Sequence, residues 1–359
     1  MIEKSAVRSY RLIRPDYVNL TDKVKVLLSE LLRINGIKFH LIDGRTKTIE
    51  SFQEKIRKPN KFYENPLKQL TDLSGVRVIV YYHDDVEKVA NVLVKEFQVV
   101  EKEVSHQASE YNPEQFGYIS LHYIVKIGLD RAELSEWKMY ESLLVEVQIR
   151  TVLQHSWTSI SHALQYKNEV DVPKSLRRKL NRLAGLFELA DEQFIDIRHE
   201  SEDARQEASA QILAGNNHIP IDPISLREFI NSWGALEGIV DFMLSVEFSF
   251  EDPPHAPHRD EHYEEQDYLG FISEHCHRVG LLTIEDLEKA LSFNPKNYLK
   301  NLFENNNSDW YVSEGFVLYL IIIRAKITDF CVDDLLSSGW GGSTAKKVIE
   351  IAKSDAKIS

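Results

Sequence analysis

The sequence predicts an α/β protein in which a mixed five-stranded sheet, flanked by helices, is followed by a mainly helical C-terminal domain. Five segments with the length and pattern of strands lie between residues 39 and 150, and helical patterns dominate from about residue 221 onward. A chain of 359 residues is long enough for two domains with separate cores. We place the first domain at residues 1–215 and the second at residues 221–359.

The expected elements follow from the spacing of apolar residues. A helix is expected over Asp22–Ile34, with Leu27, Leu28, Leu31 and Leu32 on its apolar face. Strands are expected near residues 39–42, 76–82, 97–104, 120–127 and 143–150. A crossover helix fills Val86–Phe97, and a long helix covers residues 175–212. The sequence Gly-Asn-Asn-His-Ile-Pro at 215–220 predicts a linker between the domains.

The segment Val145–Thr151 is the most informative one. It alternates apolar and polar residues, which predicts a half-buried strand with Glu146, Gln148 and Arg150 on one face. An acid, an amide and a cation together indicate a binding site in which the acid holds a metal and the cation holds a phosphate. An exposed face whose charges pair with one another is the alternative interpretation.

A second strand strengthens the interpretation as a site. Asp72 comes just before the apolar run at 76–82, and Arg77 projects from within that run. Beside Glu146, Asp72 would complete a pair of carboxylates for one Mg²⁺ ion. Because Mg²⁺ keeps few protein ligands and takes phosphate oxygens for the rest, such a pair is suited to a nucleoside triphosphate.

Two further segments fit a nucleotide. Residues 44–58 predict a helix, on which Lys47, Ser51 and Lys55 are four residues apart and share one face. A solvated basic face is the usual meaning of this spacing, but a hydroxyl between two cations suits a triphosphate better. Downstream, Tyr118 lies in a Gly-Tyr turn at the entrance of a strand, where its ring can stack on a purine.

Taken together, these segments resemble the synthetase domain of the RelA/SpoT family of alarmone synthetases, over roughly residues 20–200. The shared motifs are Gly-Arg-x-Lys-x-x-x-Ser-x-x-x-Lys at 44–55, Asp-Leu-x-Gly-x-Arg at 72–77, Gly-Tyr-x-Ser-x-His at 117–122, Glu-Val-Gln-Ile-Arg-Thr at 146–151, and His-x-Trp…His…Tyr-Lys ending at 167. Five motifs in this order are a specific signal. Arg182–Asp191 also resembles the closing helix of single-synthetase members that carry a C-terminal extension.

The resemblance implies an ATP-dependent diphosphotransferase, a GTP pyrophosphokinase with a nucleotidyltransferase-like fold. Such enzymes move the β,γ-pyrophosphate of ATP to the ribose 3′-hydroxyl of GDP or GTP, and they release AMP and (p)ppGpp. Reactions of this type require mainly charge neutralisation and in-line positioning of the reactants. Cations and a metal ion therefore matter more in such a site than a covalent nucleophile.

The resemblance also assigns a role to each matching residue. Asp72 and Glu146 would hold Mg²⁺, and Glu146 would also draw the proton from the 3′-hydroxyl. Together with Arg77 they form the expected catalytic group. Arg45 and Arg77 would flank the adenine; Lys47, Ser51 and Lys55 would hold the ATP phosphates; Tyr118 would stack on the guanine; and His122, Gln148, Arg150 and His155 would line the acceptor pocket.

The chain departs from the family pattern at Ser159 and Ser161, where many relatives have acids. The acceptor therefore stays open, and two alternatives remain beside (p)ppGpp synthesis. One is a toxic relative that pyrophosphorylates the 3′ end of tRNA and is restrained by its C-terminal domain. The other is a catalytically silent nucleotide sensor, against which the intact Asp72, Glu146 and Lys47 speak.

Composition predicts a cytoplasmic enzyme. Only two cysteines are present, which argues against a disulfide framework. The N-terminal residues are mixed and charged, unlike a signal peptide. The longest apolar run, Phe316–Ile323, is far shorter than the roughly 20 residues of a membrane span, so it predicts a buried helix and no membrane partner. The number of copies in the assembly is left open.

Charge is unevenly distributed. Residues 1–60 carry 13 Lys and Arg against 7 Asp and Glu, residues 241–300 carry 5 against 13, and the whole chain has a net charge of −13. The basic part suits polyphosphate ligands, and the acidic part disfavours broad binding of nucleic acid.

The second domain shows no second catalytic motif. It lacks the His-Asp motif of the hydrolase half of bifunctional relatives, so we expect synthesis without hydrolysis. His255, His258 and His262 have the spacing of metal ligands, but the neighbouring prolines favour an exposed loop, and His275–His277 adds further candidates. A regulatory domain and a passive stabilising domain are both open.

Overall fold

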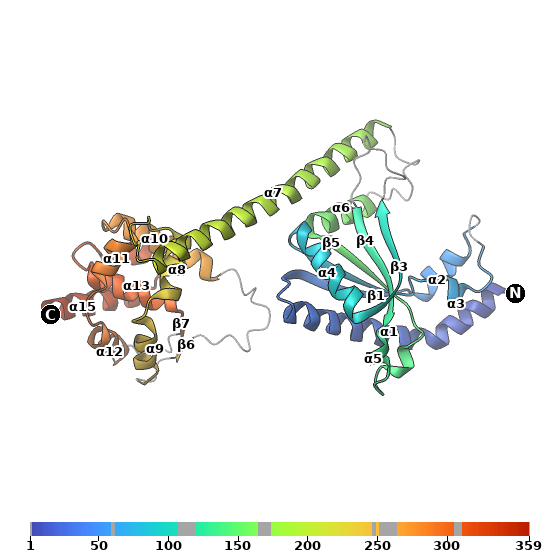
Figure 1. The fold of residues 1–359 in the computed structure, drawn as a ribbon, viewed down its shortest axis with the longest axis horizontal. Helices are drawn as coiled ribbons and strands as arrows, with labels where there is room; N and C mark the ends of the chain where they lie inside the picture. Colours follow the sequence, from blue (N-terminus) through green and yellow to red (C-terminus); the bar gives the residue numbers. More distant parts are fainter. Residues whose placement is uncertain are drawn as a thin grey trace. The chain divides into compact units, whose positions relative to one another are not determined.

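A computed structural model describes residues 2–58, 62–106, 119–163, 174–245, 249–250, 264–304 and 311–358. The chain divides into two compact units, Met1–Arg198 and His199–Ser359 (Figure 1). The division falls inside helix α7 (Lys174–Leu213), upstream of the linker expected at 215–220. The reason is that the last part of α7 packs with the second unit, where Ala208 and Ile212 join the core.

Unit 1 is built on a five-stranded sheet with the order β1-β2-β5-β4-β3. The strands are β1 (Phe39–Thr46), β2 (Ser74–Val80), β3 (Phe97–His106), β4 (Ile119–Ile127) and β5 (Val145–Thr151). β2 and β5 run parallel, while β1·β2, β3·β4 and β4·β5 are antiparallel pairs. The mixed five-stranded sheet predicted from the sequence is thereby confirmed.

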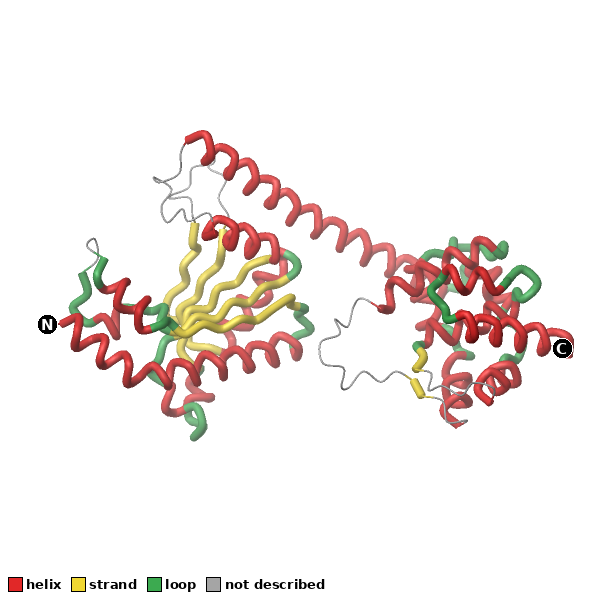
Figure 2. Tube along the Cα trace, turned by 180° about the vertical axis from the view of Figure 1, so that it is seen from behind, coloured by secondary structure: helices red, strands yellow, loops and turns green. Residues whose placement is uncertain are grey.

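Helices α1 (Ile2–Ile34) and α4 (His83–Glu96) cover one face of this sheet (Figures 1 and 2). Leu20 and Leu28 of α1 and Leu93 of α4 are fully buried against alternate residues of the central strands, among them Val78 and Val147. Burial of each such side chain stabilises the fold by about 1.5–3 kcal/mol. Side chains alternate along a strand, so the neighbours of Val78 and Val147 in the sequence point to the opposite face of the sheet.

Helices α2 (Ile49–Ile56) and α3 (Pro66–Gln69) pack on the N-terminal half of α1. Tyr10 of α1 stacks on Phe52 of α2 with ring centroids 4.4 Å apart, and both side chains are completely buried. The prediction of one helix over residues 44–58 is wrong at its start. β1 continues to Thr46, and α2 begins only after Thr48, whose hydroxyl oxygen accepts a hydrogen bond from the backbone N–H of Ser51.

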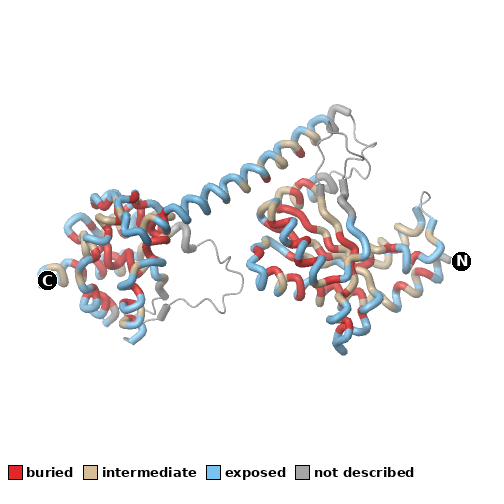
Figure 3. Tube along the Cα trace, in the orientation of Figure 1, coloured by how far each residue is buried: buried red, intermediate tan, exposed pale blue. Residues whose placement is uncertain are grey.

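The remaining helices of unit 1 follow β4 and β5. They are α5 (Leu129–Ala132), the short 3₁₀ helix η1 (Lys138–Tyr140), α6 (Val152–Ala163) and the first part of α7. Trp157 of α6 packs against Ala184 and Phe187 of α7. Thus one face of α7 belongs to the core of unit 1, although much of this helix is exposed (Figure 3).

Unit 2 is mainly helical, as predicted. Besides the end of α7 it contains α8 (Pro223–Ser232), α9 (Leu236–Ser245), α10 (Glu264–Arg278), α11 (Ile284–Ala290), α12 (Lys296–Glu304), α13 (Glu314–Ala325), α14 (Val332–Ser337), α15 (Gly342–Ile358) and a two-stranded parallel sheet of β6 (Ser249–Phe250) and β7 (Tyr311–Val312). The apolar run Val317–Ile323 of α13 is fully buried, which confirms the predicted core helix. In the part of the chain that is described, no helix has the length and apolarity that crossing a membrane requires.

The candidate metal ligands of unit 2 do not converge. His275 is buried and hydrogen-bonded to Tyr319, Cys276 is buried in the apolar core, and His277 is exposed. His255, His258 and His262 lie outside the described residues. Among the residues that can be placed, no three His, Cys, Asp or Glu side chains form a metal-binding group.

Candidate active site

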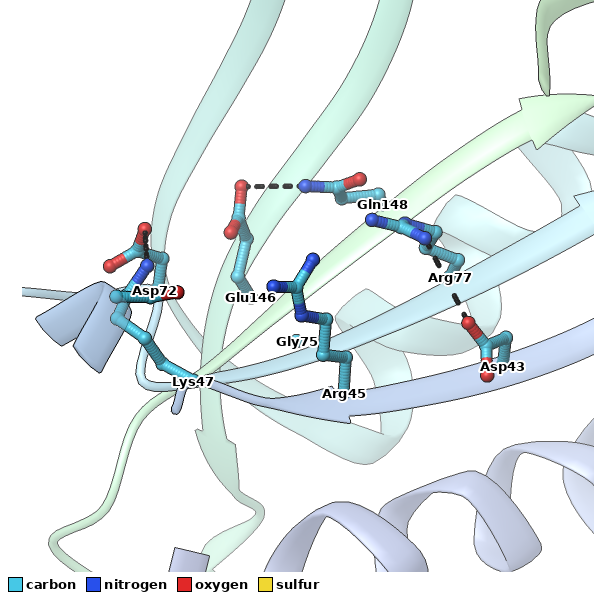
Figure 4. Close-up of a pocket in the computed structure, with 9 residues that line it drawn as sticks. Asp43, Arg45, Lys47, Asp72, Gly75, Arg77, Glu146 and Gln148 are labelled. Carbon is cyan, nitrogen blue, oxygen red and sulfur yellow. Dashed lines mark hydrogen bonds and ion pairs between the residues drawn. The ribbon is translucent and has the colours of Figure 1, made fainter. Parts of the chain in front are cut away.

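A cavity of about 260 Å³ lies on the polar face of the sheet (Figure 4). Its walls are formed by Asp43, Arg45, Lys47, Ser51, Asp72, Gly75, Arg77, Glu146 and Gln148. The strand register explains why these residues meet. Asp43, Arg77 and Gln148 are directly opposite one another across β1, β2 and β5, and Arg45, Gly75 and Glu146 form the next such row. Residues directly opposite across paired strands share one face of a sheet.

Glu146 is held by two neighbouring side chains. Its Oε1 accepts a hydrogen bond from Nε2 of Gln148 at 3.1 Å, and Nδ1 of His122 on β4 lies 3.1 Å from the same oxygen. Gln148 in turn accepts a 3.0 Å hydrogen bond from Nη2 of Arg150. Nε2 of His122 lies 2.9 Å from the hydroxyl of Ser120. Since these contacts fix the carboxylate, Glu146 is oriented before any ligand binds.

Asp72 lies at the other end of the cavity, beside Lys47 (Figure 4). Its Oδ2 accepts hydrogen bonds from Nζ of Lys47 at 2.8 Å and from Nζ of Lys55 at 2.5 Å. Lys47 lies in the turn between β1 and α2, and its backbone carbonyl accepts hydrogen bonds from the side chains of Tyr10 and Arg14. The N-terminal helix therefore fixes the turn that presents Lys47.

Both carboxylates are ionised at neutral pH. Burial raises the pKa of Asp72, but hydrogen bonds from Lys47 and Lys55 outweigh burial and leave the pKa below its ordinary value. Burial and the charge of Asp72 also raise the pKa of Glu146. Hydrogen bonds from His122 and Gln148 outweigh them, so this pKa too is lowered. Two charged carboxylates at one cavity are a donor set for a divalent cation.

The free oxygens of this pair fit such a cation. Oδ1 of Asp72 is buried and finds no hydrogen-bond donor among the described residues. On Glu146, both contacts with His122 and Gln148 end on Oε1. A hard cation with oxygen ligands would satisfy the buried Asp72 oxygen, and the desolvation cost of leaving it unpaired gives a physical reason for one to bind.

Positive charge continues along the cavity. Arg77 lies 3.8 Å from Asp43, which is a loose ion pair, and Arg45 projects between this pair and Glu146 (Figure 4). Beyond Gln148, burial lowers the pKa of Arg150 and of His155, and the charge of Arg77 lowers both further. Each of these side chains has a buried ring or guanidinium nitrogen, Nε of Arg150 and Nδ1 of His155, without a hydrogen-bond partner in the described structure.

The structure thus brings most of the expected site residues together. Arg45, Lys47, Ser51, Asp72, Arg77, Glu146 and Gln148 line the cavity, and Lys55, His122 and Arg150 contact its lining residues. His155 lies on α6, near Arg77 and Arg150. Lys47 does not share a helix with Ser51 and Lys55 as predicted, because β1 runs on to Thr46. Tyr118 lies outside the described residues, as does the side chain of Ser161, while Ser159 is exposed and donates to the carbonyl of His155.

Two lining residues, Asp43 and Gly75, have no role in the predictions from sequence. Asp43 is two residues before Arg45, so the strand alternation that places one on the polar face also places the other there. Gly75 lies between Arg45 and Glu146 in the same row, where its lack of a side chain keeps the cavity open. A strand predicted over residues 39–46 instead of 39–42 would have placed Asp43 on the same face as Arg45.

Three carboxylates and four cations, counting Lys55, surround a cavity on a mixed sheet. This fold and site define a phosphate-transfer enzyme. Comparison with known proteins is more specific. The model of the family described as "Region found in RelA / SpoT proteins" matches residues 44–171. GTP pyrophosphokinase YwaC of Bacillus subtilis is 31% identical over 161 residues, which cover 44% of this chain and 72% of that protein.

A second relative, GTP pyrophosphokinase YjbM of Bacillus subtilis, is 28% identical over 169 residues, or 46% of this chain and 74% of that protein. Among solved structures, small alarmone synthetase 1 from Bacillus subtilis is 26% identical, with 55% of this chain and 98% of that chain covered and a TM-score of 0.45. The chain belongs to the RelA/SpoT family of pyrophosphotransferases.

Proposed function

We propose that this protein is a (p)ppGpp synthetase, which transfers the β,γ-pyrophosphate of ATP to the 3′-hydroxyl of GDP or GTP. The observation that supports this proposal best is the joint placement of Asp72 and Glu146 with Lys47, Lys55 and the arginines at one cavity. The names of the two relatives, both GTP pyrophosphokinases, agree with this chemistry.

In the proposed reaction, Lys47, Ser51 and Lys55 bind the phosphates of ATP. Both lysines now pair with one oxygen of Asp72, so each has further N–H donors for phosphate oxygens. We assign the metal site to Asp72 and Glu146; bound Mg²⁺ would offset the negative charge that develops on the transferred group. Arg45 and Arg77 lie further along the cavity, where they suit the adenosine part of ATP.

Glu146 stands between the phosphate end and the Gln148 end of the cavity (Figure 4). A 3′-hydroxyl placed there would donate a hydrogen bond to its carboxylate and be held in line with the transferred phosphorus. As the 3′-oxygen bonds to the β-phosphorus and the bond to the leaving AMP breaks, the carboxylate of Glu146 would accept the hydroxyl proton, and its lowered pKa keeps it ionised for this step. His122 and Gln148 keep this carboxylate in place during the reaction.

The test is transfer of label from γ-labelled ATP to separate acceptors, namely GDP, GTP and deacylated tRNA. We expect labelled guanosine products with GDP or GTP, and we expect Asp72→Asn and Glu146→Gln to abolish them. Transfer to tRNA alone would replace this proposal by the tRNA-modifying alternative. ATP binding without transfer to any acceptor would favour a nucleotide sensor.

A further inference from the structure

Ser120 belongs to the Gly-Tyr-x-Ser-x-His motif, but the proposed reaction gives it no role. It lies on β4, two residues before His122, so the two side chains share the polar face of the sheet. Both residues are half-buried. The walls of the cavity, as far as the structure describes them, do not include Ser120. Any part that Ser120 has in the reaction must therefore act through a neighbouring side chain.

Three side chains form a chain of polar contacts that ends on Glu146. Oγ of Ser120 lies 2.9 Å from Nε2 of His122, and Nδ1 of the same ring lies 3.1 Å from Oε1 of Glu146. A neutral imidazole has one N–H donor and one lone-pair acceptor, and its two nitrogens can exchange these roles. The ring can therefore donate to Glu146 in only one of its two tautomers.

The carboxylate of Glu146 determines which tautomer fits. An ionised carboxylate only accepts hydrogen bonds, so Nδ1 of His122 must carry the proton if it is to donate to Oε1. Nε2 is then an acceptor, and the hydroxyl of Ser120 is in place to donate to it. In the opposite tautomer, the lone pair of Nδ1 would face a carboxylate oxygen. Since the side chain of His122 is only 11% exposed, water is a poor substitute for the Ser120 hydroxyl.

A second chain of contacts reaches the same oxygen of Glu146. Nη2 of Arg150 donates to Oε1 of Gln148 at 3.0 Å, and Nε2 of Gln148 donates to Oε1 of Glu146 at 3.1 Å. Because a guanidinium can only donate, Arg150 fixes which end of the Gln148 amide points toward Glu146. Ser120 has the same relation to the imidazole of His122 as Arg150 has to this amide.

We propose that Ser120 is a positioning residue for pyrophosphate transfer, which acts through the tautomer of His122 rather than by contact with the reactants. By favouring the Nδ1–H form, it keeps a donor on Oε1 of Glu146 and leaves Oε2 for the metal ion or the acceptor hydroxyl. Orientation of this kind raises the rate of the chemical step and adds nothing to ATP binding. The inference rests on the proposed function, but the tautomer is a property of the protein and is measured without substrate.

The first test is the tautomer of His122 in the full-length chain. Nuclear magnetic resonance of protein with nitrogen-15 histidine distinguishes a ring nitrogen that carries a proton from one that does not, and His122→Gln identifies the signals. The measurement is made in mildly alkaline solution, where histidine rings are ordinarily neutral. We expect the Nδ1–H form in the wild type and in Ser120→Thr, which keeps the hydroxyl, and a gain of the Nε2–H form in Ser120→Ala. An Nε2–H ring in the wild type, or one tautomer mixture in all three proteins, would overturn the proposal.

The second test separates the rate of transfer from substrate binding. Ser120→Ala should lower kcat by about ten- to 100-fold, as expected when the partner that orients a metal-site residue is lost, while KM for ATP changes little. Ser120→Thr should restore most of the rate. Ser156→Ala is the matched control, because the hydroxyl of Ser156 donates to the carbonyl of Val152 within α6. If Ser120→Thr is as slow as Ser120→Ala, the hydroxyl does not have the proposed role.

Substitution of His122 tests whether Ser120 acts through this ring. In His122→Asn the side-chain amide can still donate to Glu146 from the position of Nδ1, but it has no counterpart of Nε2. Adding Ser120→Ala to His122→Asn should therefore lower kcat no further. An equal loss of rate in both backgrounds would show that Ser120 acts independently of His122 and would refute the proposal. A wild type that transfers pyrophosphate to no acceptor would contradict the proposed function instead, and the tautomer of His122 would still decide this inference.

Discussion

The hydroxyl of Thr151 donates a 2.9 Å hydrogen bond to Oδ2 of Asp191, forty residues further along the chain. Thr151 ends β5, and it also caps α6, because its hydroxyl oxygen accepts a hydrogen bond from the backbone N–H of Gln154. Asp191 is only 5% exposed, and a buried carboxylate needs such donors. The bond therefore ties α7 to the turn between Arg150 and His155, at the end of the candidate site.

We predict that Thr151→Val lowers the rate of pyrophosphate transfer more than it weakens ATP binding. Valine keeps the shape of threonine but removes both hydrogen bonds of the hydroxyl, which should cost about 1–3 kcal/mol of folding free energy. The phosphate-binding lysines lie at the other end of the cavity, so kcat should fall while KM for ATP changes little. Steady-state kinetics and thermal unfolding together measure both effects.

Thr158→Val is the matched control. Among the described residues, the hydroxyl of Thr158 donates to the carbonyl of Gln154 in its own helix and to no other group. Its loss should leave kcat unchanged. Equal activities of the two valine variants would show that the link from Thr151 to Asp191 has no part in positioning α6.

The two lysines at Asp72 give a second prediction. Lys47→Ala and Lys55→Ala should each weaken ATP binding by about 1.5–3 kcal/mol, as expected for hydrogen bonds to a charged group. This corresponds to an increase in Kd of about ten- to 150-fold. Calorimetric titration with a non-hydrolysable ATP analogue measures it. Lys58→Ala is the control, because Lys58 is exposed just beyond α2. If ATP affinity is unchanged in both variants, the lysines serve only to hold Asp72.

The start of α2 shows where sequence patterns were sufficient and where they were not. The existence of all five strands and of α4 and α7 followed from apolar spacing, since these elements bury one face. The pattern of β1 is weaker, because Leu41 is 45% exposed and only Ile42 of this strand is buried. The apolar pattern therefore predicts a strand that ends too early and a helix that includes Lys47. Thr48, an N-cap residue type, was the local signal for the true helix start.

Other features depend on packing between distant residues. Helix α1 begins at Ile2 rather than near Asp22 and continues through Pro15, because Tyr10 and neighbouring side chains pack against α2. The burial of Asp191 depends on a partner forty residues away. No periodic pattern encodes such contacts. By contrast, the sequence motifs contain nearly every charged residue of the cavity. The reason is that the register of β1, β2 and β5 places residues from separate motifs opposite one another in neighbouring rows.

The ion pairs of Asp72 make stability depend on pH. Although burial raises its pKa, the hydrogen bonds from Lys47 and Lys55 leave it below the ordinary value of 3.8. A carboxyl whose pKa is lower in the folded state stabilises the fold above its unfolded pKa, and that contribution is lost as the pH falls through the folded value. Asp72→Asn should therefore be less stable than the wild type at pH 7.

This deficit should shrink as the pH falls below about 3.8, where the wild-type carboxyl also becomes neutral. Thermal midpoints of both proteins across the acidic range measure the difference. If the difference in thermal midpoint between the two proteins stays constant down to the lowest pH at which the fold persists, the charge of Asp72 does not stabilise the fold through Lys47 and Lys55.

The last prediction concerns unit 2. It carries no catalytic motif and is acidic, so we expect it to regulate the synthetase rather than to take part in the reaction. The cut should fall after Arg198, because the end of α7 belongs to unit 2, where Ala208 and Ile212 pack into the core and would be left exposed by a cut at Gly215. Residues 1–198 keep the sheet, its helices and the cavity, and their core is separate from that of unit 2.

If unit 2 regulates, the 1–198 protein should remain folded by circular dichroism while its transfer rate changes several-fold, or its expression should become toxic. Deletion of α15 alone is the matched comparison, since it disturbs unit 2 and leaves unit 1 complete. The same acceptor panel applied to the truncated protein separates two kinds of regulation. A changed rate with an unchanged acceptor indicates control of turnover, whereas a new ability to modify tRNA indicates that unit 2 restrains a toxic activity. An unchanged rate and an unchanged acceptor would instead identify unit 2 as a passive domain.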